Sequence, residues 1–494
     1  MSRPTVVHWF RQDLRLGDHP SWCAAVADAQ ARGAHLLAVA VWDPAQAEAT
    51  AWSPVRCGPW RQAWLADSLA ALDADLRAQG QQLLVLRGQP HEVLPRCMTA
   101  VHGVALHAET WPAPEEQAEE RALRAASMAS MASTASATSS DTATGWRWHT
   151  HAPSVLLPLD TLPWPVTGMP DGYTPMRQAV EAAQARQGDP WPQPIQAPAD
   201  LPPPPPAARW QDLPLGGPAP RLSLHSDPRS SFPFRGAPQT EHATAASTSP
   251  EASFSAGEAG AQAHLQRYLA QGHAEHYKAT RNKLTGLTYS SKWSPWLAVG
   301  AISAPQLMQA VRAHEAAQGA SDGSYWLWFE LLWREHFRLL QHKHGAALYR
   351  WRGLSDAPAA RERLRRPAEA SLGQRHADAQ RQQAAAERWR QGQTGQPLVD
   401  AAMRELSATG YLSNRLRQVA ASWLVHDLGV DWRVGAAWFE AQLIDFDVHS
   451  NQGNWLYLAG LGTDPRGGRR FDPVKQAREH DPDGHFQRLW GTLA

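Results

Sequence analysis

The sequence predicts two domains, a doubly wound α/β domain with a parallel sheet followed by an all-α domain. The first observation is that short apolar runs alternate with amphipathic stretches up to about Glu109. The second is that only helical periodicity is found from Gly257 onward. A chain of 494 residues is also too long for one ordinary core. We therefore place the α/β domain at residues 1–170, an interdomain connection at 171–256 and the helical domain at 257–494.

The α/β domain is expected to contain buried parallel strands joined by helices, and such sheets bind ligands beyond the carboxyl ends of their strands. No G-x-G-x-x-G fingerprint follows the first strand, so neither a flavin nor a nicotinamide is placed there on that ground. The segment RQDLRLGDHP stands there instead. We interpret Arg11, Asp13 and Arg15 as a salt-bridged loop, with a ligand site as the alternative. The predicted strands are TVVHWF, LLAVAVW, QLLVLRG and GVALHAE, and the predicted helices lie at residues 20–30, 60–79 and 91–101.

Two stretches have the composition of irregular segments. Residues 125–145 form an Ala/Ser/Thr tract with little to bury, which predicts a flexible surface insertion. Residues 187–256 contain five consecutive prolines at 202–206 and then Ser/Ala/Thr-rich sequence. This second stretch is typical of a connection between domains, stiff in one part and disordered in another.

Charge and cysteine usage limit the class of protein. Lys and Arg total 47 and Asp and Glu total 47, so a nucleic-acid partner would have to bind a local basic patch. Cys23, Cys57 and Cys97 are widely spaced and show no metal-ligand pairing, which indicates a reducing compartment without a disulfide framework. No apolar run has the length of a membrane span, and a strand-like segment already begins at Thr5. We expect a soluble, cytoplasmic, monomeric protein.

The helical domain holds two candidate site segments. In YWLWFELLWREHFRLL, apolar residues recur every three or four positions, and Glu330 lies beside that face as either a buried hydrogen-bonded acid or a pocket residue. In LIDFDVHSNQGNW, Asp445 and Asp447 stand among apolar residues, where carboxylates require partners. The alternative for the second segment is a helix end whose Asp, Ser and Asn residues cap backbone donors.

Taken together, six segments resemble the cryptochrome/photolyase family, and the resemblance covers almost the whole chain apart from the two low-complexity stretches. Chance assembly of all six in this order is not credible. They are WFRQDLRLGDHP, YKATRNKLTGLTYSSKWSPWLAVGAIS, FELLWREHFR, GQTGQPLVDAAMREL, YLSNRLRQVAASWLVHDLGVDWR and LIDFDVHSNQGNW.

Within this family the chain is most similar to the DASH cryptochromes, which resemble photolyases acting on single-stranded DNA. The segments that carry this similarity are DPRGGRRFDPVKQAREHDPDGHFQRLW, LPWPVTGMPDGYTPMRQAV and YSSKWSPWLA. Gln418 stands where other cyclobutane photolyases carry Met, and Tyr457 stands where they carry a second pocket Trp. The (6-4) photolyases place His where this chain has Asn414 and Gln418.

The resemblance implies a site for FAD. Arg417 would pair with Asp445 near the flavin, Asp447 would accept a hydrogen bond from the isoalloxazine ring, and Asn451 would lie near its N5 and favour the fully reduced state. Asn414 would also contact the cofactor, and His449 is given no role. The FAD phosphates and ribose would be held by Tyr277, Arg281, Ser290, Ser291, Lys292 and Ser294; their hydroxyls and basic groups suit a pyrophosphate, although a Ser-rich loop that caps the next helix is equally compatible.

The resemblance also implies an electron relay and a substrate pocket. Trp455 and Trp432 match the first two relay tryptophans, a role compatible with core packing, and Trp351 is the candidate for the third. The segment 333–366 holds nine Arg or Lys against three Asp or Glu, which predicts either phosphate contacts or a solvated helical face. The flipped-out pyrimidine dimer would lie against Glu330, Trp333, Asn414, Gln418 and Tyr457.

The expected function is light-driven, FAD-dependent repair of cyclobutane pyrimidine dimers, preferentially in single-stranded DNA. Glu330 and Asn451 favour repair over the alternative, a blue-light receptor in which flavin photoreduction changes a partner interaction. The resemblance further implies a methenyltetrahydrofolate antenna in the α/β half, with Glu109 as its candidate contact.

Overall fold

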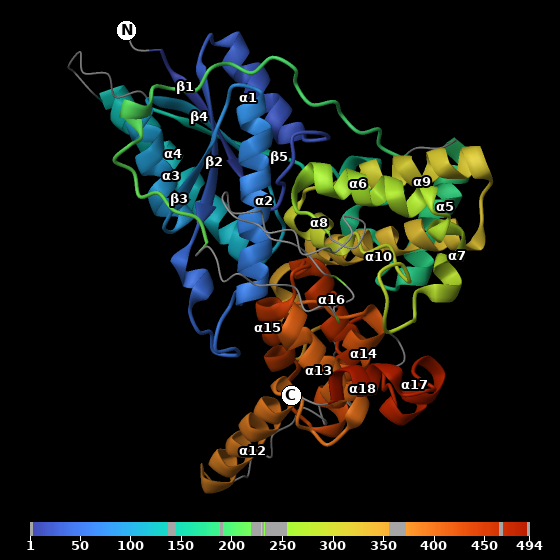
Figure 1. Cartoon of the computed structure of the whole chain (residues 1–494). Helices are drawn as coiled ribbons and strands as arrows, with labels where there is room; N and C mark the ends of the chain where they lie inside the picture. Colours follow the sequence, from blue (N-terminus) through green and yellow to red (C-terminus); the bar gives the residue numbers. More distant parts are fainter. Residues whose placement is uncertain are drawn as a thin grey trace, which may run out of the picture.

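The N-terminal domain contains a five-stranded sheet (Figure 1). The structure is a computed structural model, and it describes residues 3–136, 145–187, 191–218, 229, 232, 254–354, 372–463 and 468–491. The strands are all parallel, and their spatial order is β3-β2-β1-β4-β5. The predicted fold class is confirmed. The bounds are β1 Thr5–Phe10, β2 His35–Trp42, β3 Leu83–Arg87, β4 Gly103–Glu109 and β5 Arg147–His151.

Helices cover both faces of this sheet because alternate strand residues point to opposite sides. Val6 and Phe10 of β1 belong to one core, and Val7 and Trp9 belong to the other. The first core is shared with α1 and α2, and the second with α3 and α4. Figure 1 shows the resulting three-layer arrangement. These helices are α1 Pro20–Ala31, α2 Pro59–Ala78, α3 Pro90–Ala100 and α4 Pro114–Ser136.

The edge strand β5 was not predicted from the sequence. Its residues, RWHTH, are only partly buried and contain no apolar run, so the signal that identifies the other four strands is missing. The strand forms because it pairs in register with β4, from Ala105 opposite Arg147 to Glu109 opposite His151. Tertiary pairing therefore outweighs local sequence preference here.

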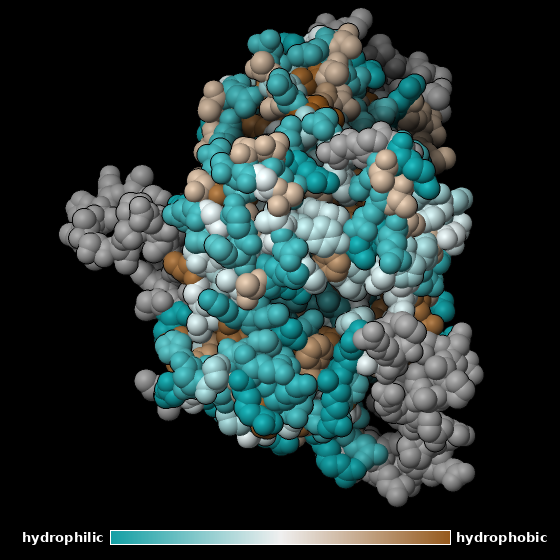
Figure 2. All heavy atoms as spheres, turned by 90° about the vertical axis from the view of Figure 1, so that its right-hand side faces the viewer, coloured by the Kyte–Doolittle hydropathy of each residue, from teal (hydrophilic) through white to brown (hydrophobic). Residues whose placement is uncertain are grey.

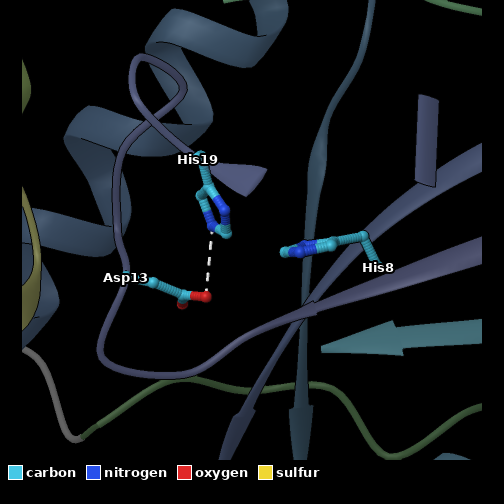
Figure 3. Close-up of side chains that lie close together, drawn as sticks. All are labelled: His8, Asp13 and His19. Atoms are coloured by element: carbon cyan, nitrogen blue, oxygen red, sulfur yellow. Dashed lines mark ion pairs between the residues drawn. The ribbon is translucent and has the colours of Figure 1, made fainter. Parts of the chain in front are cut away.

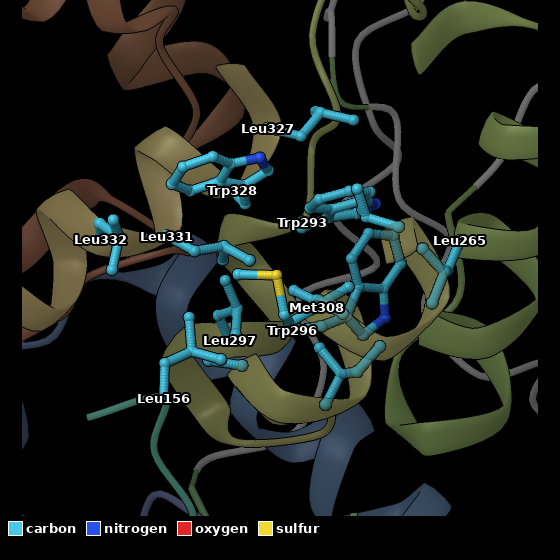
Figure 4. Close-up of a cluster of buried hydrophobic side chains, with 14 of the residues drawn as sticks. Leu156, Leu265, Trp293, Trp296, Leu297, Met308, Leu327, Trp328, Leu331 and Leu332 are labelled. Carbon is cyan, nitrogen blue, oxygen red and sulfur yellow. The ribbon is translucent and has the colours of Figure 1, made fainter. Parts of the chain in front are cut away.

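From α6 onward the described part of the chain is helical, as predicted, and its helices contribute to two hydrophobic cores. Helix α5 lies instead within the stretch that was predicted to be the interdomain connection. One core is centred on α6 to α10 and includes Trp293, Trp296 and Trp328 (Figure 4). The other joins α13 to α16. The helices are α5 Tyr173–Gln187, α6 Gly257–Ala270, α7 His273–Thr280, α8 Ser294–Val299, α9 Ala304–Gln318, α10 Asp322–His344, α12 Leu372–Arg390, α13 Pro397–Thr409, α14 Asn414–Ser422, α15 Trp432–Gln442, α16 Val448–Ala459, α17 Pro473–His480 and α18 His485–Gly491.

The two domains are joined by close backbone contact after β1. The amide of Leu14 donates to the carbonyl of Val299, and Arg15 donates to the carbonyl of Gly300. Gly300 ends α8 in the left-handed region at φ +73°, and a Cβ there would collide with the carbonyl of Gln12. Only glycine allows this approach without strain. The RQDLRLGDHP loop is therefore fixed against the helical domain.

The Ala/Ser tract differs from the expected flexible insertion over its first part. Helix α4 continues through Ser136, because alanine has the highest helix propensity and Ser127 holds the helix against the chain that leads into β5. Ser127 is buried, donates to the carbonyl of Trp146 and accepts from the amide of Trp148. The remaining residues of the tract, 137–144, lie outside the described residues.

The proline run lies against the α/β domain. The amide of Leu36 donates to the carbonyl of Pro203, and an isolated bridge joins Leu215 to Leu86 of β3. The segment expected to be disordered lies mostly at positions 219–253, of which the structure describes only 229 and 232.

The face shown in Figure 2 is mostly hydrophilic, with hydrophobic residues in small separate patches. Among the described helices, none combines the length and the apolar character that crossing a bilayer requires.

Candidate functional site

A buried ion pair joins the two halves of the site. Arg417 of α14 donates to Asp445 at 2.7 Å and also to the carbonyl of Leu412 at 2.8 Å. Asp445 is almost fully buried, so its charge requires this partner. Burial opposes ionisation of Arg417, but Asp445 outweighs this and raises the pKa of the guanidinium above its usual value. The partner that the sequence predicted for Asp445 is present in the structure.

Asp447 both caps a helix and lines a pocket. It is the N-cap of α16, and its carboxylate accepts from the amide of Ser450 at 2.7 Å. Burial would raise the pKa of this carboxyl, but Arg334, His449 and the hydrogen bond from Ser450 lower it. The helix-cap alternative is therefore correct for Asp447, and it does not exclude a role in a site.

A pocket between α14 and α16 brings together many of the predicted residues. We call it the α14–α16 pocket. Asn451 is oriented within it because its side-chain amide donates to the carbonyl of Ala436 at 3.1 Å. The sequence-predicted residues that line this pocket are Asn414, Arg417, Gln418, Asp445, Asp447, Asn451 and Trp455. Phe439, Leu443 and Phe446 add an apolar wall, which suits a flat aromatic ligand.

Lys292 is a buried cation next to this ion pair. Its ammonium lies 3.6 Å from the ring centre of Tyr289 and 4.7 Å from that of Tyr411, and it has no hydrogen-bond partner among the described residues. Burial lowers its pKa well below the usual value, and Glu405 and Asp445 oppose this effect. An anionic ligand would provide the missing acceptors.

The other residues predicted to bind phosphate and ribose surround the same segment. Tyr277 is buried, which raises its pKa to about 12. The carbonyl of Ser291 accepts from His264, and Ser290 contacts the hydroxyl of Tyr411. Ser294 is the first residue of the six-residue helix α8.

Glu330 is paired with another predicted residue instead of lining the α14–α16 pocket. Its carboxylate accepts from Arg281, whose guanidinium also lies 4.5 Å from the ring centre of Trp326. Of the two alternatives predicted for Glu330, the hydrogen bond is present, although the side chain is about one third exposed. Glu330 is not among the residues that line the two pockets described in this section.

The predicted substrate residues Trp333 and Tyr457 form a second aromatic group outside this pocket. Trp333 stacks on Tyr173 with ring centres 3.7 Å apart and contacts Tyr457 edge-to-face at 6.2 Å. Tyr173 was missed by the sequence analysis. The available signal was its place in the DASH-like segment LPWPVTGMPDGYTPMRQAV, where it starts α5.

Of the three tryptophans predicted to form a relay, two are buried and one lies at the surface. Trp455 lines the pocket and is buried, as is Trp432. Gly435 lies one turn after Trp432, and a Cβ there would collide with the ring of Trp455, so this glycine allows the helices to approach. The indole of Trp432 donates to the carbonyl of Trp351, whose side chain is 44% exposed.

A fourth tryptophan, Trp389, also contacts the inner end of this series. It is fully buried on α12 and meets Trp455 edge-to-face at 6.4 Å. Its indole donates to the carbonyl of Ala420. No feature of the sequence distinguishes Trp389 from the many other tryptophans.

A second pocket lies between the domains, and we call it the interdomain pocket. Its lining includes Glu109, Trp111, Asp447 and His449, so Asp447 borders both pockets. Burial and nearby Asp13 raise the pKa of Glu109 well above its usual value, and Arg15 opposes this effect. His449 stacks on Trp111 at 5.9 Å, and neither ring nitrogen has a hydrogen-bond partner among the described residues.

The loop after β1 forms ion pairs, as interpreted from the sequence. Arg11 pairs with Glu119 and Glu120 of α4. Asp13 pairs with His19 at 3.1 Å. Arg15 additionally lines the interdomain pocket, so the ligand-site alternative stays open for this residue alone.

The basic segment offers fewer free cations than its composition indicates. Arg338 pairs with buried Glu335, and Lys343 pairs with Asp171. Arg350 and Arg352 are exposed on either side of Trp351. The four arginines at positions 361–366 lie outside the described residues.

Comparisons with known proteins identify two family regions. Residues 6–199 match the model described as DNA photolyase, and residues 326–492 match the FAD binding domain of DNA photolyase. Proteins named cryptochrome DASH from Gloeobacter violaceus and from Synechocystis sp. are 37% and 35% identical, each over 99% of this chain and over 86% and 87% of their own lengths. The one from Danio rerio is 35% identical over 98% of this chain and 82% of its own length.

Solved structures show the same architecture. The crystal structure of the Synechocystis sp. PCC6803 cryptochrome superposes with a TM-score of 0.80 at 34% identity, covering 99% of this chain and 89% of the other. A class III photolyase from Agrobacterium tumefaciens has a TM-score of 0.70 at 24% identity, with 99% and 86% covered, and shows the likeness of fold alone.

We predict that Arg417→Met destabilises the protein by about 3 kcal/mol, because it leaves the buried Asp445 without its counter-ion. The measurement is urea-induced unfolding at pH 7. The control is Arg433→Met, since Arg433 pairs with Asp431 at the same 2.7 Å but that acid is partly exposed. The control should cost less than about 1 kcal/mol. Equal losses in the two variants would contradict the structural role of the pair.

Proposed function

The chain belongs to the cryptochrome/photolyase family as a DASH cryptochrome, and from this membership we propose that it repairs cyclobutane pyrimidine dimers with light, preferentially in single-stranded DNA. The single observation that carries the proposal is the α14–α16 pocket beside two basic residues, the partly buried Arg417 and the fully buried Lys292. It is supported by the match of residues 326–492 to an FAD-binding domain. We propose further that the protein acts as a cytoplasmic monomer.

The residues present fit FAD. Lys292 has a buried ammonium without a hydrogen-bond partner, which suits the diphosphate, and Tyr277, Arg281, Ser290, Ser291 and Ser294 lie on the same segment. The flat apolar part of the pocket suits the isoalloxazine. Reduced FAD would supply, when excited by light, the electron that opens the cyclobutane ring.

The protein's own task is to orient both partners and to exclude water. Asp447 is held as an acceptor by its cap position, and Asn451 is held by Ala436, so both present fixed polar groups to the pocket. Asn414 and Gln418 line the same pocket from α14. Fixed dipoles of this kind need no rearrangement during the reaction.

The proposed dimer-binding wall is the stacked group of Trp333, Tyr173 and Tyr457, with Glu330 one turn from Trp333 on α10. Unstacked bases bind aromatic faces, and a single-stranded dimer costs less to extrude than a paired one. The exposed Arg350 and Arg352 are candidates for phosphate contacts.

We also propose a methenyltetrahydrofolate antenna in the interdomain pocket. Glu109 has a buried carboxyl oxygen without a hydrogen-bond partner among the described residues, and Trp111 offers an aromatic face beside it. Burial raises the pKa of Glu109 and so favours the neutral carboxyl, the form that can donate to a heterocyclic nitrogen or carbonyl of such a ligand.

The alternative function is a blue-light receptor without repair activity. The observation that favours it is the exposure of Trp351, which places the end of the proposed relay at the protein surface, where a partner could respond to it. Both functions use the same relay, so repair must be measured directly.

We predict that the reduced, flavin-loaded protein repairs a cyclobutane dimer in a single-stranded oligonucleotide under blue light, and repairs the matching duplex more slowly because the base must first be unpaired. The measurement is chromatography of the restored oligonucleotide, with dark samples as controls. Repair of neither substrate would contradict the lyase. Equal repair of both substrates would contradict only the proposed preference for single-stranded DNA and would leave the proposed lyase activity standing.

We predict that Trp455→Phe slows flavin photoreduction by at least about tenfold and leaves repair by prereduced protein within about twofold, because the relay only supplies electrons to oxidised flavin. The control is Trp389→Phe, since Trp389 is equally buried and contacts the same ring. Transient absorption and repair assays give the two rates. A loss of repair in Trp455→Phe at full flavin content would contradict this division of roles.

A further inference from the structure

A row of histidines crosses the sheet on the face covered by α1. His8 of β1 pairs in register with His107 of β4, which in turn pairs with His149 of β5. Two residues along β5, His151 points to the same face as His149. The ring of His107 stacks between these two, with ring centres 4.6 Å and 5.2 Å apart. The row lies outside both the α14–α16 pocket and the interdomain pocket.

The outer end of this row is arranged like a metal site. Asp28 of α1, His107 and His149 each place one possible ligand atom within 4.8 Å of the others. His107 Nε2 lies 3.2 Å from Asp28 Oδ2. His149 Nε2 is buried and has no hydrogen-bond partner among the described residues. Two imidazole nitrogens and one carboxylate oxygen form a donor set typical of zinc and of neighbouring divalent transition metals.

His151 provides the outer contact that such sites require. Its Nε2 lies 3.0 Å from His107 Nδ1, on the side of the ring opposite Asp28. When a metal binds one nitrogen of a histidine, the other nitrogen carries the proton and needs an acceptor, and this partner fixes the ring.

The inner cluster of His8, Asp13 and His19 offers similar donors, which lie close together in Figure 3. It differs from the outer cluster in its access to solvent. Its side chains are completely buried, and they already have internal partners. His8 contacts Ser21, and His19 accepts from the amide of Trp22 and pairs with Asp13. These residues close the end of α1 onto the sheet. In contrast, Asp28 is 22% exposed, so the outer cluster opens to solvent.

We propose that Asp28, His107 and His149 bind one divalent transition metal ion, with water as the fourth ligand and His151 as the positioning residue behind His107. The ion would join α1 to β4 and to the edge strand β5. Arg32 competes for the site, because it donates to Asp28 Oδ1 at 2.7 Å. Its side chain is 42% exposed and can move into solvent when the ion binds.

The test is titration of tag-free, chelator-treated, flavin-loaded protein with Zn²⁺ against a competing chromophore, and with Co²⁺ followed by visible absorption. One equivalent should bind, and Co²⁺ should give the intense bands of a four-coordinate site. His149→Ala and Asp28→Asn should abolish this binding. His151→Phe should weaken it by roughly 10- to 100-fold. Arg32→Ala should strengthen it, since the competing cation is removed.

The matched control is His91→Ala, because His91 is an exposed histidine of the same domain. It should bind the metal as the unmodified protein does, and flavin content should be unchanged in all variants. Asp28→Asn preserves shape at a partly exposed position, so it decides the outcome if His149→Ala does not fold. Absence of saturable binding of one equivalent, or its persistence in Asp28→Asn, would overturn the proposal.

Discussion

The pairing of buried charges is the constraint on which the helical domain depends. Arg417 and Asp445 come from segments that precede and follow α15, and removing Arg417 would leave the buried carboxylate of Asp445 without its counter-ion. Their contact fixes α14 beside the chain segment that enters α16. Lys292 lies in the same electrostatic environment, but it is accompanied by aromatic rings in place of an acceptor. A buried ammonium without a hydrogen-bond acceptor destabilises the folded protein unless a ligand supplies the acceptor.

The start of α16 connects this site with the rest of the molecule. Asp447 is the N-cap of α16, and it lines both pockets. His449 follows two residues later and lines only the interdomain pocket of the two. One short segment thus separates the proposed flavin and antenna positions. The RQDLRLGDHP loop closes the other side of the interdomain pocket, held by its contacts with Val299 and Gly300. Both domains therefore contribute residues to the interdomain pocket.

The sequence was sufficient where the relevant signal is local. Apolar runs predicted β1 to β4, and helical periodicity predicted the C-terminal domain. The sequence did not predict β5, because the polar segment RWHTH has no strand signal of its own and forms a strand by pairing with β4. It also failed for the start of the Ala/Ser tract, where contacts of Ser127 support a helix.

The candidate site was predictable to the extent that its residues share one segment or match a family motif. The pocket residues of α14 and α16 were identified in this way. Sequence could not show that Glu330 pairs with Arg281, or that Tyr173 stacks on Trp333, since both contacts join distant parts of the chain. The histidine row was missed for the same reason, because it depends on the register of three strands.

The most direct test of the central claim is to measure both FAD affinity and flavin-free stability of Lys292→Met. If Lys292 is retained for a ligand, removing a buried amine that has no hydrogen-bond partner among the described residues should leave the flavin-free protein as stable or more stable, while FAD binding weakens by at least about tenfold. Lys278→Met, at an exposed ion pair with Asp322, should change neither quantity appreciably. Unchanged FAD affinity in Lys292→Met, or loss of stability without loss of affinity, would contradict the account.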